Sequence, residues 1–187
     1  GIGGVLVAII YTAGPFPLAY NGLGEVAAGI FMGPMIVVGG YYVMQPDISN
    51  QKLLELVVLS FPIMFMTAAI LHANNIRDMD ADRAVNKRTL AVLLGLRWAR
   101  VEYMFLVWVT YIAQIVLVLV GLMPAATLVT LITLPEAQRL IHIFNTSDDV
   151  KLLHQAQGRT AKLHGQMGLL VFVAWIVYLL VRSWLPL

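Results

Sequence analysis

Residues 56–88 read LVVLSFPIMFMTAAILHANNIRDMDADRAVNKR, an uncharged run that leads into a dense group of charges. Leu56 to Asn75 carries no charge and is about long enough to cross a hydrocarbon core of ~30 Å. Seven of the twelve residues from Arg77 to Arg88 are charged, against 12% of the whole chain. The stretch therefore predicts a membrane-spanning helix that carries a charged segment to the membrane surface.

The acidic residues of this segment are spaced for a cation. If the helix continues beyond the apolar run, Asn74, Asp78 and Asp82 fall four residues apart on one helix face. Carboxylates so placed repel each other unless a cation lies between them. Mg²⁺ carrying a diphosphate fits this pattern, because Mg²⁺ favours a few carboxylates together with phosphate oxygens. Asp80 points away from this face and is expected to pair with a nearby arginine. The basic residues that could hold the remaining phosphate charge are Arg77, Arg83, Lys87 and Arg88.

Composition places the whole chain in the membrane. It is 60% apolar and has a mean hydropathy of +0.83, which excludes an ordinary soluble domain, and no nucleic-acid partner is expected. We expect an all-α, polytopic transmembrane helical bundle in one membrane domain, residues 1–187, with a partial first helix over residues 2–10. The expected full spans are 24–45, 53–76, 99–121, 124–143 and 163–184.

The basic residues indicate how these spans are oriented. With the spans placed as above, one side of the membrane receives ten lysines and arginines and the other receives only Lys52 and Arg182. By the positive-inside rule, the acidic segment faces the cytoplasm, or the equivalent matrix or stromal side. The loop 11–20 and the polar connector 145–157 are expected on the same side, while the chain folds back at 121–124 on the other.

The roles of several polar residues near the membrane surface have two interpretations. His72 is more often a satisfied polar side chain than a metal ligand or a catalytic base. Arg159 and Lys162 begin the last span, where they either extend to the interface or contact a phosphate. Tyr11 either belongs to the interfacial aromatic belt or forms an active-site wall that stabilises a developing allylic cation. Thr12 lies beside it, and a hydroxyl at this helix end could hold an aromatic substrate.

Three motifs, in the same order and over most of the chain, resemble signatures of the UbiA superfamily of intramembrane prenyltransferases. The most similar branch contains the 1,4-dihydroxy-2-naphthoate prenyltransferases of menaquinone synthesis. The motifs are Tyr-Thr-Ala-Gly-Pro at 11–15 with Gly-Leu-Gly-Glu at 22–25, Asn-Asn-Ile-Arg-Asp-x-x-x-Asp-Arg at 74–83 with Lys-Arg-Thr-Leu-Ala-Val at 87–92, and Arg-Thr-Ala-Lys-Leu-His at 159–164.

The resemblance implies a role for each matched position. Asp78 and Asp82 would bind Mg²⁺ and a polyprenyl diphosphate. The residues beside them or near the phosphates would be Asn74, Arg77, Lys87, Arg88, Arg159 and Lys162. Tyr11 and Thr12 would help to form the pocket for the aromatic acceptor. The family fold is a bundle of about nine spans around a cavity that is open to lipid. The family reaction ionises the allylic diphosphate, the acceptor ring carbon attacks the cation, and in the menaquinone branch the naphthoate carboxylate is lost.

The chain also departs from the family pattern. Members carry a first aspartate-rich motif on an early helix, and nothing before Tyr11 supplies one. The chain therefore resembles the C-terminal two-thirds of a member, and an upstream segment or a separate chain is expected to complete the site. Two alternatives stay open: a related enzyme that uses homogentisate or 4-hydroxybenzoate, and a non-catalytic subunit that binds a quinone or lipid in a larger membrane complex. The intact pair Asp78 and Asp82 favours an enzyme.

Overall fold

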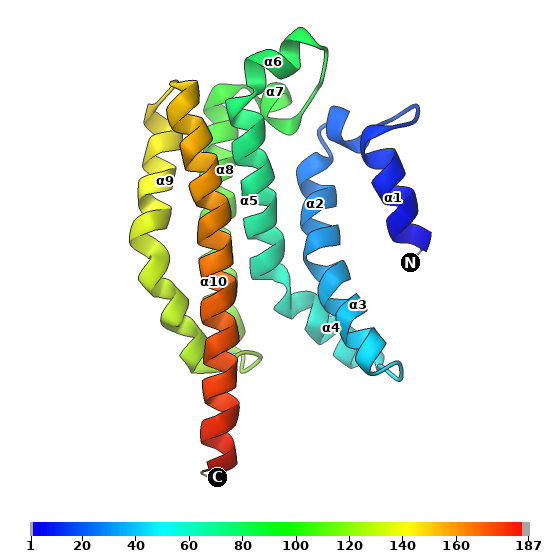
Figure 1. The fold of residues 1–187 in the computed structure, drawn as a ribbon, viewed down its shortest axis with the longest axis vertical. Helices are drawn as coiled ribbons and strands as arrows, with labels where there is room; N and C mark the ends of the chain where they lie inside the picture. The colour runs from blue at the N-terminus through cyan, green and yellow to red at the C-terminus, as the bar shows by residue number, and fades with distance from the viewer. Residues whose placement is uncertain (1, 185–187) are drawn as a thin grey trace.

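The computed structural model describes residues 2–184, and this range is helical with no β-strand (Figure 1). The expected all-α class is confirmed. In chain order the elements are α1 (Ile2–Thr12), the 3₁₀ helix η1 (Leu18–Tyr20), α2 (Gly24–Met32), α3 (Pro34–Met44), α4 (Asn50–Leu59), α5 (Phe61–Arg77), α6 (Met79–Ala84), α7 (Leu90–Leu94), α8 (Leu96–Leu119), the 3₁₀ helix η2 (Ala125–Thr133), α9 (Leu134–Thr146) and α10 (Val150–Trp184).

Several helices are long and apolar enough to cross a membrane. These are α2 and α3 taken together (21 residues), α8 (24 residues) and α10 (35 residues). A fourth span is formed if α4 and α5 count together, although this pair bends by 42°. The bend falls at Ser60, whose hydroxyl donates to the Val57 carbonyl, and Pro62 follows without a backbone N–H. The chain is therefore an integral membrane protein, and the expected span 53–76 is bent rather than straight.

The expected span 124–143 also differs from a regular helix. Its first part is η2, and α9 begins only at Leu134. Thr127, Thr130 and Thr133 each donate a side-chain hydrogen bond to the carbonyl three residues earlier, at 2.6–3.0 Å. Such bonds accompany the tighter 3₁₀ turn, and Pro135 provides no N–H to extend an α-helix backwards.

The last helix begins earlier than expected. The polar connector predicted over 145–157 is a short turn at 147–149, and α10 starts at Val150. Asp149 explains this start, because its carboxylate accepts from the Lys151 N–H at 2.9 Å and its carbonyl accepts from Leu153. The fold-back at 121–124 is confirmed, and Gly121 supplies the positive φ of 77° that the turn needs.

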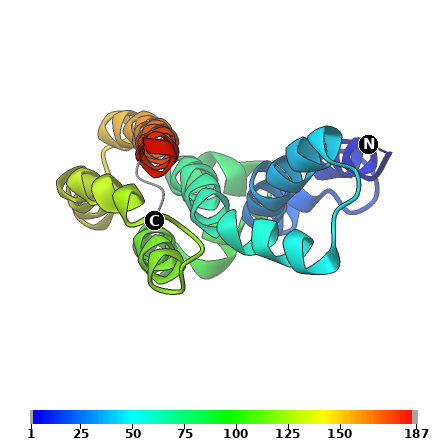
Figure 2. The same ribbon diagram turned by 90° about the horizontal axis from the view of Figure 1, so that it is seen from below.

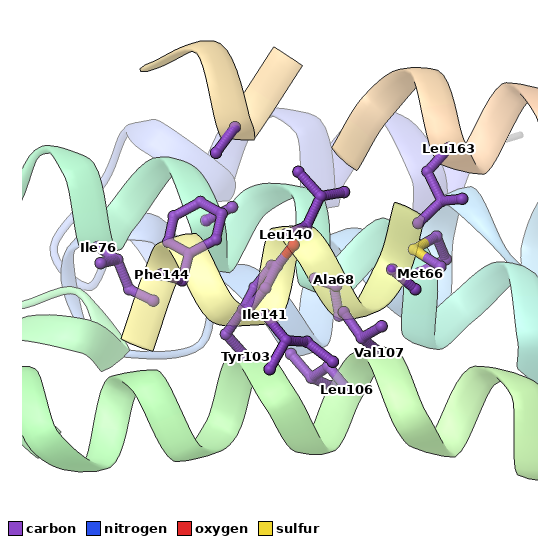
Figure 3. Packing of buried hydrophobic residues seen from close by; sticks show 14 of the residues in the cluster. Met66, Ala68, Ile76, Tyr103, Leu106, Val107, Leu140, Ile141, Phe144 and Leu163 are labelled. Carbon is purple, nitrogen blue, oxygen red and sulfur yellow. The ribbon is translucent and has the colours of Figure 1, made fainter. Parts of the chain in front are cut away.

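Helix α5 lies in the middle of the bundle, between α2 on one side and α8 and α10 on the other (Figure 2). Its alanines at 69 and 73 have no exposed surface, so neighbouring backbones approach it closely. The core between α5, α8, α9 and α10 is filled by larger side chains (Figure 3). Within it, the Tyr103 and Phe144 rings lie 4.3 Å apart between centroids, and the Tyr103 hydroxyl bonds Thr160 on α10 at 2.8 Å.

The contact between α5 and the α2–α3 stretch depends on glycine. A Cβ at Gly33 would lie 2.9 Å from the Met64 Cα and 2.7 Å from the Gly29 carbonyl oxygen. Any other residue at this position would therefore force the two helices apart. This crossing fixes where the start of α2, which carries Glu25, lies along α5.

The charged segment lies at one end of the bundle. There α6 and α7 lie near η1, the start of α10 and the end of α9 (Figure 1). The opposite end has the α3–α4 turn and the turn before η2. One end of the bundle therefore gathers the motif at 11–15 and the charged motif at 74–92.

Candidate active site

The Asp-rich segment is formed by a helix that ends and restarts. Helix α5 ends at Arg77, Asp78 has φ −95° and ψ 7°, and α6 begins at Met79. The expectation of one continuous helix is therefore wrong at Asp78. The Asp82 N–H nevertheless bonds the Asp78 carbonyl at 2.8 Å, so the two aspartates stay one turn apart.

Arg77 connects the first half of this segment to the last helix. Its guanidinium donates to both carboxylate oxygens of Asp78, with Nε 2.7 Å from Oδ1, and to the Asn74 side-chain oxygen at 2.7 Å. On its other side it donates to His154 Nδ1 at 2.9 Å and to the Gln157 side-chain oxygen at 3.2 Å. Arg77 thus fixes Asn74 and Asp78 relative to α10.

Lys87 connects the second half to the loop that follows α1. Its Nζ lies 3.1 and 3.3 Å from the two carboxylate oxygens of Asp82, which is 7% exposed. The same Nζ lies 5.9 Å from the centroid of the Tyr20 ring, and the Arg88 N–H donates to the Tyr20 carbonyl at 3.2 Å. Arg88 itself is exposed. The loop 13–20 and the Asp-rich segment are therefore neighbours, as their shared side of the membrane predicted.

Tyr11 and Thr12 end α1 at the same end of the bundle. The Tyr11 hydroxyl lies beside Gly24, since a Cβ built there would be 3.5 Å from it. Below it, an apolar crevice of ~240 Å³ between α1 and α2 is lined by Tyr11, Val7 and Phe31. Thr12 is exposed. The Tyr11 side chain thus lines an apolar space.

A buried polar network lies between Tyr11 and the Asp-rich segment, and the sequence reading did not identify it as a unit. Glu25, His72 and Asn75 are 3%, 0% and 4% exposed. One oxygen of Glu25 accepts from His72 Nδ1 at 3.0 Å and from Asn75 Nδ2 at 2.8 Å, while His72 Nε2 lies 2.8 Å from the Ala99 carbonyl. With Glu25 ionised, the carboxylate and the Ala99 carbonyl can only accept, so both ring nitrogens then donate and Glu25 and His72 form a buried ion pair.

The contacts of His72 indicate a structural role for its side chain. Its ring is fully satisfied and inaccessible, which matches a structural polar side chain rather than a metal ligand or base. The signal in the sequence was a glutamate at the start of an apolar span, because an ionisable group within the membrane requires a partner. The network holds α2, α5 and α8 together directly beside the candidate site.

Two expected phosphate contacts lie elsewhere. Arg159 forms a two-pronged ion pair with Glu136 of α9, with both distances 2.8 Å, and Lys162 lines the same groove. His154 and Gln157, which touch Arg77, lie on a different face of α10. The structure therefore does not bring Arg159 and Lys162 to the aspartates. Asp80 pairs with Arg83 at 3.2 Å, as expected.

The donor set fits a metal ion only in company with a ligand. Among residues 2–184, no group of three or more histidine, cysteine, aspartate or glutamate side chains is placed to hold a metal ion. Asp78 and Asp82 supply two carboxylates one turn apart, with cations beside both. Mg²⁺ is commonly bound by one or two carboxylates plus substrate phosphates, so these residues fit a Mg²⁺–diphosphate and not a metal site made of protein alone.

The fold and the site together define a helical membrane protein with paired aspartates and cations at one membrane surface. Residues 1–157 match the family model of the UbiA prenyltransferase family, and the chain belongs to that family. No solved structure shows significant similarity to it.

Three relatives illustrate the match. The chain is 28% identical over 177 residues to the 1,4-dihydroxy-2-naphthoate octaprenyltransferase of Bacillus subtilis, covering 95% of this chain and 56% of the relative. It is 35% identical over 185 residues to the UbiA prenyltransferase domain-containing protein 1 of Danio rerio, covering 99% and 51%. The human protein of the same name is 32% identical over 167 residues, covering 89% and 46%. The chain thus spans about half the length of these curated relatives.

Proposed function

We propose that this chain provides the second aspartate motif and part of the acceptor pocket of a Mg²⁺-dependent prenyltransferase. The carrying observation is the placement of Asp78 and Asp82, one turn apart among cations, beside the loop that follows Tyr11. The proposed substrates are a polyprenyl diphosphate and an aromatic acceptor. Family membership and the names of the relatives support this class of reaction.

Each residue has a proposed task in that reaction. Asp78 and Asp82 would hold Mg²⁺, which when bound neutralises diphosphate charge and makes it a better leaving group. Lys87, Arg88 and Arg77 would contact phosphate oxygens, with Asn74 orienting Arg77. The Tyr11 ring would face the allylic carbon as its bond to the diphosphate oxygen breaks.

We further propose 1,4-dihydroxy-2-naphthoate as the acceptor. The Bacillus subtilis relative is named for this acceptor, and 95% of the chain aligns with it. The acceptor ring carbon would form a bond to the prenyl carbon, and the ring carboxylate would leave as carbon dioxide. Homogentisate and 4-hydroxybenzoate are the competing acceptors, and measuring turnover of all three with one prenyl diphosphate distinguishes them.

The test compares two aspartates of the same segment in the full-length protein. Asp82→Asn removes a buried carboxylate from the proposed site, and Asp80→Asn removes a carboxylate whose side chain is 98% exposed. We expect Asp82→Asn to lower Mg²⁺-dependent transfer by about a hundredfold or more. Asp80→Asn should stay close to wild type. Equal activity of both variants would refute the proposed site.

The non-catalytic alternative makes a different prediction. A subunit that only binds quinone would co-purify with it, retain it in Asp82→Asn, and show no turnover with any acceptor. The network of paired charges around Asp78 and Asp82 favours the enzyme, because a site for an apolar quinone needs no paired acidic and basic side chains.

A further inference from the structure

A groove on the far side of α10 from Arg77 has no role in the proposed reaction. It lies between α10 and the segment formed by η2 and α9, with a volume of ~670 Å³. Arg159 lines both this groove and a neighbouring hollow of ~490 Å³ on α9, which Arg139 also lines. Along the helices, the charged residues of the groove lie toward one end and its apolar residues toward the other.

The end of the groove nearest the start of α10 is positively charged. Arg159 is engaged by Glu136, and the charges of Arg139 and Lys162 also act on that carboxylate. Arg139 and Lys162 are exposed, and within residues 2–184 neither takes part in an ion pair. Three cations thus surround one carboxylate, which leaves a local excess of positive charge.

The other end of the groove is apolar. Ile132 on η2 and Leu169 on α10 line it and are 68% and 62% exposed. Roughly two turns of α10, from Lys162 to Leu169, therefore separate the cationic region from the aliphatic one.

Membrane depth agrees with this division. Helix α10 has 35 residues, and at ~1.5 Å per residue it is longer by roughly 20 Å than a ~30 Å hydrocarbon core. Residues 163–181 carry no lysine, arginine or carboxylate, and Arg182 follows them, so this part of the helix is placed in the hydrocarbon. Arg159 and Lys162, in the third and fourth turns, then fall at the level of lipid headgroups, and Leu169 falls at the level of acyl chains.

We infer that this groove, together with the neighbouring hollow, binds an anionic phospholipid, whose phosphate lies beside Arg159, between Arg139 of the hollow and Lys162 of the groove, and whose acyl chain lies along Ile132 and Leu169. The charge of the groove matches a phosphate, and the apolar half directly below matches the chain attached to it. Arg159, already held by Glu136, keeps α9 and α10 at the spacing that the lipid requires.

The experiment uses the full-length protein in nanodiscs of phosphatidylcholine with a rising share of phosphatidylglycerol, and native mass spectrometry counts retained lipids. We expect retention of phosphatidylglycerol in preference to phosphatidylcholine. The double variant Arg139→Gln, Lys162→Gln should lower that preference by about twenty-five-fold, at about fivefold per basic residue. Lys151→Gln, which removes an exposed cation of α10 outside the groove, should leave it unchanged.

Further variants keep the test decisive. Arg139→Lys with Lys162→Arg retains both charges and should retain the lipid, which separates loss of charge from loss of folding. Equal loss in Lys151→Gln and in the double variant would overturn the proposal, since it would show a general surface effect. Displacement of the lipid by millimolar inorganic phosphate would also overturn it, in favour of a soluble phosphate ligand. None of these readouts depends on prenyl transfer.

Discussion

Glu25 offers the most direct test of how the site is held together. Replacing it with alanine removes the oxygen that accepts from both His72 and Asn75, and these donors have almost no exposed surface. The charged His72 ring would keep only the Ala99 carbonyl and Glu102, whose nearest oxygen is 3.7 Å away.

The expected cost can be worked out from these contacts. Two buried donors left without an acceptor cost about 1–3 kcal/mol each. Removing one partner of a buried ion pair costs about 3–5 kcal/mol, so the two estimates overlap near 4 kcal/mol. Hydrogen bonds between membrane helices average only about 0.6 kcal/mol, which makes the charge of His72 the main contribution.

The assay is unfolding of the full-length protein by sodium dodecyl sulfate in mixed micelles, followed by tryptophan fluorescence. Glu55→Ala is the matched control, because Glu55 pairs with Lys52 at 3.0 Å where both side chains are partly exposed, so its loss should cost under about 1 kcal/mol. Glu25→Ala should also weaken the coupling to His72 in a double-mutant cycle. If Glu25→Ala costs no more than Glu55→Ala, the reasoning about a charged buried network is wrong.

Three further predictions concern the site and its orientation. Tyr11→Phe keeps the aromatic face and should retain transfer activity within a few-fold, whereas Tyr11→Leu should lose about tenfold in kcat; equal rates would exclude a role for the ring. Exchanging charges with Asp82→Lys and Lys87→Asp keeps an ion pair, so the protein should fold, yet Mg²⁺-dependent transfer should vanish; retained transfer would mean that the pair is only structural. With any cysteine outside these cysteine-free 187 residues replaced, Asp80→Cys, at a 98% exposed side chain, should react with an impermeant maleimide only from the cytoplasmic side; labelling from the other side would reverse the proposed topology.

The helical class and the location of the Asp-rich segment followed from the sequence because they depend on composition and local spacing. An uncharged run of membrane length specifies a span, and basic residues specify its ends. The i, i+4 spacing of Asp78 and Asp82 survives the interruption at Asp78, since one backbone hydrogen bond crosses it. Pairing of Asp80 with Arg83 is similarly local, three residues apart in a short helix.

The features that sequence did not predict depend on contacts between distant helices. Glu25 and His72 are 47 residues apart, and only the packing of α2 on α5 brings them together. Which neighbours Arg159 contacts depends on how α10 is rotated about its axis against α9. The hydrophobic periodicity could not predict this rotation, because α10 has polar and apolar residues on every side. The 3₁₀ stretch η2 was missed because apolar composition does not distinguish it from an α-helix, although its three threonines at i, i+3 spacing were a usable signal.

The ion pairs of the Asp-rich segment explain how it could accept a highly charged ligand without destabilising the membrane interface. Each aspartate has its own cation: Arg77 for Asp78, Arg83 for Asp80 and Lys87 for Asp82. A Mg²⁺–diphosphate brings positive charge for the carboxylates and negative charge for the basic groups, so opening the Asp82–Lys87 pair around it would leave both partners compensated. Mg²⁺ alone would compensate Asp82 but leave Lys87 without a counter-charge, and diphosphate alone would compensate Lys87 but leave Asp82 without one. Because Asp82 is nearly buried, the loss of pairing there is costly. The proposed site should therefore bind Mg²⁺ and diphosphate together far better than it binds either one alone.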